Sequence, residues 1–402
     1  MKIDSMSGGE RRAAFSLAGI FSLRMLGLFM IYPVFALWAR RLPDATEFTI
    51  GLALGVYGLT QAIFQIPLGF LSDRLGRKRV IGIGLSVFAV GSVVAALSHS
   101  IVGIILGRLL QGAGAVGSAT LALAADLTRE QVRTKAMAII GMTIGLSFSL
   151  SLVASPVLNR WIGVPGIFWL TAILALLGIG ALYTLVPQPL SSSVHAESEP
   201  VPALFRRVLT DRELLRLNFG IFVQHAILTA SFLSVPLVLK SSGVSVHDQW
   251  FVYLPVLVVS VIGMVPLIIL ADRGRMKPIF LASVAALGVS QLLLLLGHGG
   301  LPMVIVALLV FFTAFNLLEA SLPSIISRVA PAEAKGTALG IYSSSQFFGI
   351  FVGGALGGWL QGVWGLAGVF GLCAVLAGLW LLVALAMRLP GRASSHTAAG
   401  EA

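Results

Sequence analysis

Gly69-Phe-Leu-Ser-Asp73-Arg-Leu-Gly76-Arg77-Lys78-Arg79 is a short basic segment with two glycines, placed between two long apolar runs. A weaker copy, Ala271-Asp272-Arg273-Gly274-Arg275-Met276-Lys277, follows about 200 residues later, again between apolar runs. A basic loop that recurs in two halves of an apolar chain indicates a membrane protein built from two similar units. It also points to transport.

The composition supports a membrane protein. Of the 402 residues, 57% are hydrophobic and only 11% are charged, whereas soluble domains carry roughly 25% charged residues. Lipid must therefore be the solvent for much of the surface. The net charge of +11 does not indicate nucleic-acid binding, because the basic residues lie in loops between apolar runs. The single cysteine, Cys373, excludes an intramolecular disulfide and a cysteine-ligated metal site.

Twelve apolar runs are long enough to be considered as transmembrane helices, which need about 20 residues each. The first run is too long for a signal peptide and contains Arg24, so we expect it to be a membrane span. The approximate spans are 14–38, 50–71, 80–97, 101–125, 136–158, 165–186, 215–239, 250–271, 279–297, 301–325, 336–360 and 365–387.

The loops are strongly asymmetric in positive charge. Twenty-one Lys and Arg residues fall on the side of the N-terminus and only four on the opposite side, namely Arg40, Arg41, Arg160 and Lys240. Because cytoplasmic loops carry the excess of Lys and Arg, both termini are expected in the cytoplasm. The membrane is expected to be a bacterial-type inner membrane.

One long polar segment divides the spans six and six. We therefore predict an N-terminal six-helix bundle at 1–186, a flexible cytoplasmic linker at 187–214, a C-terminal bundle at 215–387 and a cytoplasmic tail at 388–402. The halves repeat at an offset of about 200 residues. Asp73 matches Asp272, Lys135 matches Lys335, and Arg24 falls opposite His225. Parallel repeats of this kind place a substrate site at the midplane between the bundles.

These residues resemble the major facilitator superfamily. Its loop signature, Gly-x-x-x-Asp-Arg-x-Gly-Arg-Lys, is met by residues 69–78, and its pattern Arg-x-x-Gln-Gly-x-Gly-Ala is met by Arg108-Leu-Leu-Gln111-Gly112-Ala-Gly114-Ala115. The segments 21–27, 55–67 and Phe315-Asn316-Leu-Leu-Glu319-Ala look like the YajR-type proton-coupled efflux subfamily. The resemblance implies an all-α integral membrane protein with 12 transmembrane helices in two pseudo-symmetric six-helix bundles. YajR-type proteins often carry a further soluble domain, and this sequence ends about 15 residues after the last span, so we expect that domain to be absent.

The resemblance also implies a conformational latch. Gly69 permits close helix packing and Gly76 permits a tight turn. The family pattern places Asp73 near the start of the eleventh span, at Gly336-Thr337, where the helix dipole favours an anion. Arg77 is then expected to pair with Asp126, and the cluster to favour the outward-open state. The alternative is that these charges, and above all Lys78 and Arg79, only set the topology.

Four ionisable residues lie deep within spans: Arg24, Arg108, His225 and Glu319. Such residues are costly in lipid, so each is expected to face the protein interior with a partner. Glu319 is the carboxylate expected to bind and release protons, and His225 titrates in the same range. Both lie in the C-terminal half, so they could form one coupled proton site. Arg108 is expected to hold Glu319 or a substrate anion. The alternatives are a constant partner for Glu319, a packing role for His225, and an Arg108 satisfied by backbone carbonyls. Two fixed cations against one anion also favour considering anionic substrates.

Polar side chains recur at helical spacing and predict a cavity wall or, alternatively, hydrogen bonds between helices. With the aromatic residues Phe29, Phe312 and Phe315 they could contact an amphipathic substrate. The residues proposed for the cavity are Tyr32, Tyr57, Gln61, Gln65, Gln111, Asn316, Tyr342 and Gln346.

The interpretation is a proton-coupled secondary transporter that exports small amphipathic compounds by alternating access. We expect a monomer in the lipid bilayer that needs no cofactor or metal, because the histidines outside the spans have no metal-ligand spacing and no catalytic motif is present. Antiporters of the superfamily show Gly-x-x-x-Gly-Pro in the fifth span, and here Ser151-Leu-Val-Ala-Ser155-Pro156 replaces it. The alternatives are transport of a small organic anion or a sugar-like metabolite in either direction, and a non-transporting sensor or lipid-handling protein.

Overall fold

The computed structural model describes residues 5–188, 202–297 and 300–388, and these residues contain helices and no strand. The first half consists of α1 (Gly8–Phe29), α2 (Tyr32–Ala39), α3 (Glu47–Leu75), α4 (Arg77–Leu97), α5 (Ile101–Ala113), α6 (Gly117–Asp126) and α7 (Glu130–Thr184). The second half consists of α8 (Pro202–Thr210), α9 (Arg212–Ser241), α10 (Trp250–Leu270), η2 (Ala271–Arg275), α11 (Met276–Gly297), α12 (Leu301–Val329), η3 (Ala332–Ala334) and α13 (Lys335–Leu385).

The described residues contain nine helical runs that are long and apolar enough to cross a membrane. Three of these runs, Glu130–Thr184, Trp250–Leu296 and Lys335–Leu385, are too long for one crossing, because 50 residues of helix would extend about 75 Å. Each of the three bends at a glycine of positive φ, which only glycine adopts without strain: Gly163 (65°), Gly274 (96°) and Gly365 (64°). Divided at these glycines, the runs form twelve apolar segments, which agrees with the predicted pattern.

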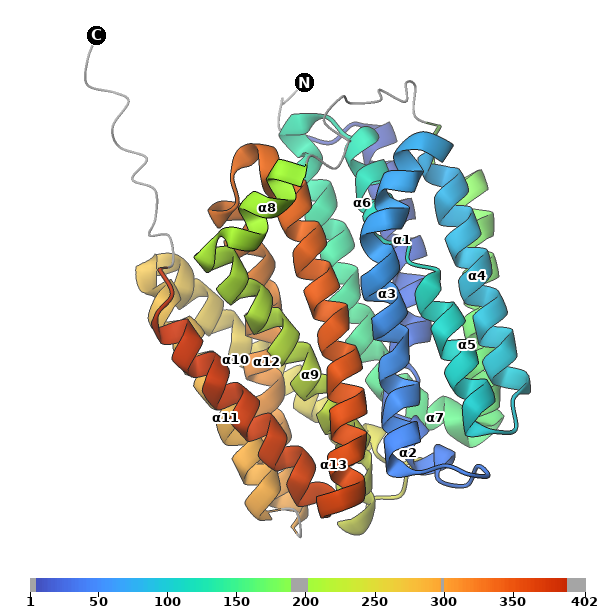
Figure 1. The fold of residues 1–402 in the computed structure, drawn as a ribbon, viewed down its shortest axis with the longest axis vertical. Coiled ribbons are helices and arrows are strands. Elements are labelled where there is room, and N and C mark those ends of the chain that lie inside the picture. The colour runs from blue at the N-terminus through green and yellow to red at the C-terminus, as the bar shows by residue number, and fades with distance from the viewer. Residues whose placement is uncertain (1–4, 189–201, 298–299, 389–402) are drawn as a thin grey trace.

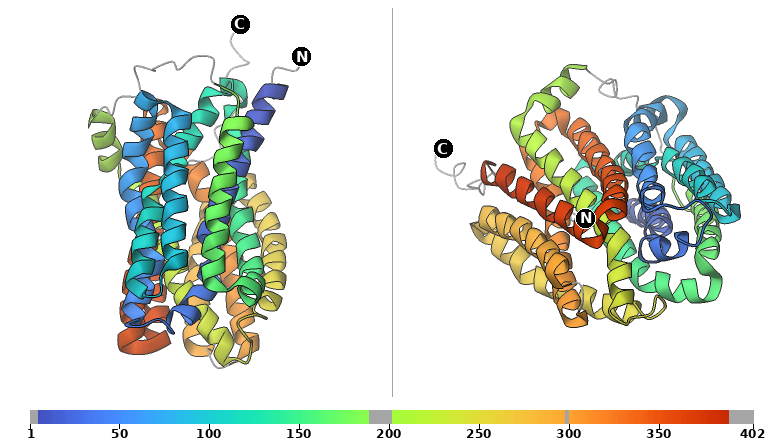
Figure 2. Two further views of the ribbon diagram at one scale, coloured as in Figure 1. Left: turned by 90° about the vertical axis from the view of Figure 1, so that its right-hand side faces the viewer. Right: turned by 60° about the horizontal axis from the view of Figure 1, so that its bottom comes forward.

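The segments pack into two bundles that lie side by side (Figures 1 and 2). In the first bundle α1 packs on α7, and α4 packs on α5 and α7; in the second, α9 packs on α13, and α11 on α12 and α13. The bundles meet where α3 contacts α13, α2 contacts α9, and α7 contacts α10. The fold is therefore the predicted two-bundle, all-helical membrane architecture.

The basic loop that recurs in both halves contains a glycine of positive φ in each. Gly76 joins α3 to α4 with φ 94°, and Gly274 lies within η2 with φ 96°. The observed turn is shorter than the segment predicted to form it. Gly69–Leu75 forms the last turns of α3, and α4 already begins at Arg77. Helices thus extend beyond the apolar residues that predicted them, since the polar loop residues continue the helical hydrogen bonding.

Two of the predicted spans are broken within the membrane segment. The first is interrupted at Met30–Ile31 between α1 and α2, where Pro33 in the first turn of α2 lacks the N–H needed to continue the helix. The fourth is interrupted between α5 and α6, at a segment that contains Gly114. A Cβ on Gly114 would collide with the Gly84 carbonyl of α4, so this glycine permits a backbone contact between the helices.

A seam of glycines joins the bundles along α3 and α13. A Cβ on Gly51 would collide with the backbone of Gly354 and Gly358, and a Cβ on Gly55 would lie 2.7 Å from the Phe351 carbonyl oxygen. Since real Cβ atoms do not approach so closely, only glycine allows these two helices to pack with their backbones in contact. The seam occupies the part of α3 nearest Glu47, away from the end that carries the basic loop.

The predicted domain limits change where the second half begins. Residues 187–214, predicted as a linker, include α8, and α9 begins at Arg212 rather than at 215. α8 contacts the first bundle through Phe205, whose ring centroid lies 6.3 Å from that of Phe70 on α3. Arg207 of α8 also pairs with Glu333 of η3 at 2.8 Å. Residues 189–201 of the predicted linker and residues 389–402 of the predicted tail lie outside the described residues.

Candidate functional site

Glu319 of α12 lies at the centre of a polar cluster in the C-terminal bundle. Its Oε2 accepts from Gln224 Nε2 at 3.0 Å, its Oε1 accepts from Gln346 Nε2 at 3.3 Å, and His225 Nε2 lies 3.8 Å from Oε2. The Glu319 side chain is 26% exposed, whereas that of His225 is 5% exposed. The structure therefore brings Glu319 and His225 together, and the carboxylate is the more exposed of the two.

The amide of Gln346 on α13 connects the two titratable groups. Its Nε2 lies 2.8 Å from His225 Nε2 and also donates to Glu319. His225 Nδ1 lies 3.3 Å from the Ile221 carbonyl oxygen, which fits a neutral imidazole that donates from Nδ1 and accepts at Nε2. A proton on either Glu319 or His225 removes an acceptor from Gln346, so this amide senses both groups.

Two further predicted cavity residues lie on the same helices. Tyr342 precedes Gln346 by one turn of α13, is buried, and its hydroxyl has no hydrogen-bond partner among the described residues. Asn316 of α12 donates instead to Ser260 of α10 at 3.4 Å. Of the two interpretations for polar stripes, Asn316 thus shows the hydrogen bond between helices.

The N-terminal bundle holds a second polar chain. Arg24 Nη2 donates to the Tyr57 hydroxyl at 2.6 Å and to Gln61 Oε1 at 2.5 Å. Gln61 Nε2 donates to Gln65 Oε1 at 2.8 Å, and Gln65 Nε2 donates to Ser343 of α13 at 3.2 Å. Tyr57, Gln61 and Gln65 are buried, so this predicted stripe forms hydrogen bonds between helices rather than an open wall.

Arg108 does not hold Glu319 in this structure, contrary to the first of its two predicted roles. Its Nε and Nη2 donate to the carbonyls of Ala53 and Leu54 on α3, and its Nη1 donates to Gln111 at 2.8 Å. Gln111 in turn donates to Ser92 of α4 at 2.8 Å. All partners lie in the N-terminal bundle, because the side chain of α5 points at α3 and α4 there. The alternative, a guanidinium satisfied by backbone carbonyls, describes this arrangement.

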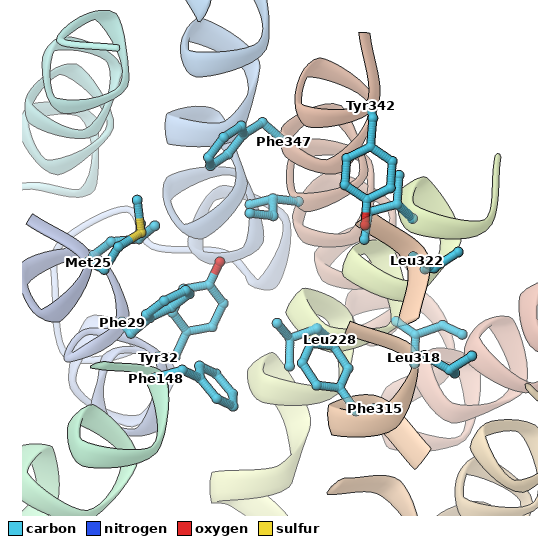
Figure 3. Close-up of a cluster of buried hydrophobic side chains, with 14 of the residues drawn as sticks. Met25, Phe29, Tyr32, Phe148, Leu228, Phe315, Leu318, Leu322, Tyr342 and Phe347 are labelled. Atoms are coloured by element: carbon cyan, nitrogen blue, oxygen red, sulfur yellow. The ribbon is translucent and has the colours of Figure 1, made fainter. Parts of the chain in front are cut away.

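Aromatic side chains from both bundles point toward one another (Figure 3). Phe148 of α7 lies 5.0 Å from Phe29, 6.0 Å from Phe315 and 6.1 Å from Phe312, measured between ring centroids. Tyr32 lies 3.5 Å from Thr229 of α9 through their hydroxyl oxygens and is fully buried. These rings close the space between the bundles with apolar surface and offer contacts to an amphipathic molecule.

The basic loop forms the predicted ion pair. Arg77 Nε lies 3.1 Å from Asp126 Oδ2 of α6, Arg77 also pairs with Asp73 one turn earlier, and its Nη1 donates to Ser72 at 2.8 Å. Asp73 of α3 thus meets Arg77 at the start of α4. Lys78, left open between topology and structure, donates to the Val186 carbonyl at 2.6 Å. Gly69 packs closely against α6, because an added Cβ would lie 3.1 Å from the Ser118 Cβ.

Several contacts were not predicted from the sequence. Gln224 holds Glu319, Ser343 links the bundles, Phe148 forms the aromatic contact, and Gln361 of α13 donates to Glu47 of α3 at 3.0 Å. Gln224 and Gln361 are amides within apolar runs, which is the one signal that could have found them. Within the described ranges no group of three or more His, Cys, Asp or Glu side chains is placed to hold a metal.

The family model of the Major Facilitator Superfamily matches residues 17–316 and 217–402. The chain belongs to the major facilitator superfamily. The inner membrane transport protein YajR of Escherichia coli (strain K12) is 47% identical over 391 residues, which cover 97% of this chain and 86% of YajR. An uncharacterized transporter of Buchnera aphidicola (subsp. Acyrthosiphon pisum) is 34% identical over 86% of this chain and 89% of its own length.

A solved structure shares the fold. A mutant of the nucleoside transporter NupG superposes with a TM-score of 0.74 at 14% identity, over 93% of this chain and 99% of that chain, which shows the shared fold alone. As a YajR-type member of the major facilitator superfamily, the protein is a membrane transporter and not an enzyme.

Proposed function

We propose that the protein is a proton-coupled secondary transporter of the inner membrane that exports small amphipathic compounds in exchange for protons. The excess of Lys and Arg in the loops on the side of the N-terminus supports cytoplasmic termini. The aromatic contacts between the bundles support an amphipathic substrate, since rings there can pack against an apolar body. Alternating access would rock one bundle against the other around this region.

The observation that carries the proposal is the set of partners around Glu319. The partners that contact its carboxylate are two neutral amides and one histidine, and none of the ion pairs of the described residues joins it to an arginine or a lysine. A carboxylate in a membrane interior needs a neutralising partner. A proton is the partner that fits, because it removes the charge when it binds and restores it when it leaves.

Protonation of Glu319 would reach the interface between the bundles through α13. Gln346 on this helix contacts Glu319 and His225, and Ser343, three residues earlier, accepts from Gln65 of α3. A change in the orientation of the Gln346 amide therefore acts on the helix that forms the glycine seam with α3. This arrangement supports coupling between proton binding and rocking of the bundles.

We assign a latch to the basic loop and a packing role to two serines. Asp73, Arg77 and Asp126 tie α3, α4 and α6 together at the end that carries the basic loops. Ser151 and Ser155 of α7 donate to the Leu26 and Met30 carbonyls of α1. The serines keep α7 against α1 as small residues do, so the departure from the glycine pattern does not weaken this helix contact.

The test is internal pH in proteoliposomes that hold a proton gradient while amphipathic cations, anions and neutral compounds are added. The wild-type protein should move protons when a substrate is added. Glu319→Gln should lower the rate of this proton movement at least about a hundredfold. Glu333→Gln, the same substitution in an exposed part of η3, is the matched control and should leave it unchanged. Transport of a labelled compound without proton movement, or a fully active Glu319→Gln, would contradict the assignment. Ligand binding with no transport at all would favour a sensor.

A further inference from the structure

Arg24 of α1 is a buried cation with unused hydrogen-bonding capacity. The residue is 1% exposed, and of its three nitrogens only Nη2 has partners, the Tyr57 hydroxyl and Gln61 Oε1. Its Nε and Nη1 atoms are buried and have no hydrogen-bond partner within the part of the chain that the structure describes. A buried donor without an acceptor is costly, so a bound molecule with acceptor oxygens would be stabilised by hydrogen bonds from these two nitrogens.

No acidic side chain balances this charge in the described residues. None of their ion pairs includes Arg24, and both partners of its Nη2 are neutral. A guanidinium does not lose its proton in a protein. Arg108 differs, because its three nitrogens all donate to acceptors of its own bundle. Glu319, the deep carboxylate, bonds only within the other bundle.

We propose that Arg24 is the docking point for an anionic group of the substrate, a carboxylate or another oxyanion. The inference rests on the proposed transport function and assigns the charge of its substrate. An oxyanion at Nε and Nη1 supplies the missing acceptors and the missing negative charge together. The proton site and the anion site then lie in different bundles, which allows a proton and a substrate anion to act on opposite sides of the rocking interface.

The surroundings of Arg24 favour an anion with an apolar body. Its Cζ lies 5.6 Å from the Phe88 ring centroid and 5.8 Å from that of Tyr57. Met25 and Phe29, the next residues along α1 that Figure 3 labels, face the side chains of the opposite bundle. Hydrogen bonds from Gln61 through Gln65 to Ser343 connect Arg24 to α13, so movement of α13 would break the Gln65–Ser343 bond and free these amides.

The test uses three probes with one ring system and different charges: 1-naphthoate, 1-naphthamide and 1-naphthylmethylammonium. Binding to the purified full chain is measured by calorimetry. The wild-type protein should bind the carboxylate at least about tenfold more tightly than the amide or the ammonium, because only the carboxylate fills the free donors. Arg24→Gln should remove this preference, and Arg24→Lys should keep part of it. Arg328→Gln, at an exposed arginine, should leave it unchanged.

The outcomes separate this inference from the proposed function. Equal binding of the three probes to the wild-type protein, or an undiminished preference in Arg24→Gln, overturns the anion site whatever the proton measurements show. If Arg24→Gln does not fold, the wild-type preference and its reduction in Arg24→Lys decide the result. Glu319→Gln should retain the preference for the carboxylate. If the wild-type protein prefers the carboxylate but moves no protons, the proposal of proton coupling is wrong and the anion site remains supported.

Discussion

At the scale of single residues, the amide of Gln346 is the contact on which the proposed proton site depends. Its Nε2 bonds both Glu319 and His225. Gln346→Leu removes both bonds, and since a hydrogen bond to a charged group contributes about 1.5–3 kcal/mol, proton-coupled transport should fall about tenfold or more. Ser345→Ala is the control, because Ser345 bonds only the Ile341 carbonyl of its own helix. Substrate-driven proton flux in proteoliposomes is the measurement, and equal rates in the two variants would disprove the role of Gln346.

At the scale of helices, the glycine seam determines how closely α3 and α13 approach. Gly55→Ala places a Cβ against the Phe351 backbone, and overpacking of this kind costs about 1–3 kcal/mol. The thermal unfolding temperature in detergent should therefore fall by several degrees. Gly141→Ala on α7 is the matched control, because its Cβ meets no atom within 4 Å and alanine is the better helix former. Equal unfolding temperatures for the two variants would show that the seam is not tightly packed in solution.

At the scale of the whole molecule, the Arg77 cluster is predicted to bias the two open states. Arg77→Gln removes the cation that Asp73 and Asp126 share, which loosens the end of α3, the helix that contacts α13 of the other bundle. The end with the basic loops should therefore open, and the population should shift by several fold. The expected shift in population is modest, because the Arg77 side chain is 20% exposed and water screens its ion pairs. Spin labels at Leu75 and Arg328, both exposed, would report this as longer distances between the bundles. Arg79→Gln, an exposed neighbour, should keep the wild-type distances, and an unchanged distribution in Arg77→Gln would rule out a latch.

The sequence by itself determined the architecture and the depth of the charged residues. Apolar runs of membrane length, the Lys and Arg bias and the repeated basic loop depend only on local composition and spacing, which lipid and the helix period translate directly into structure. The burial of Arg24 and Arg108, the pairing of Arg77 with Asp126, and the proximity of His225 and Glu319 follow from such patterns or from the family resemblance.

Only the tertiary structure decided which partner each polar residue meets. Arg108 lies against the α3 carbonyls rather than Glu319, and Gln224 and Gln346 hold the carboxylate, because helix rotation and the separation of the two bundles set these contacts. Gln61 and Gln65 likewise connect Arg24 to α13 instead of lining an open wall. A stripe at helical spacing specifies a face of one helix, and the neighbour on that face comes from packing between segments far apart in the chain.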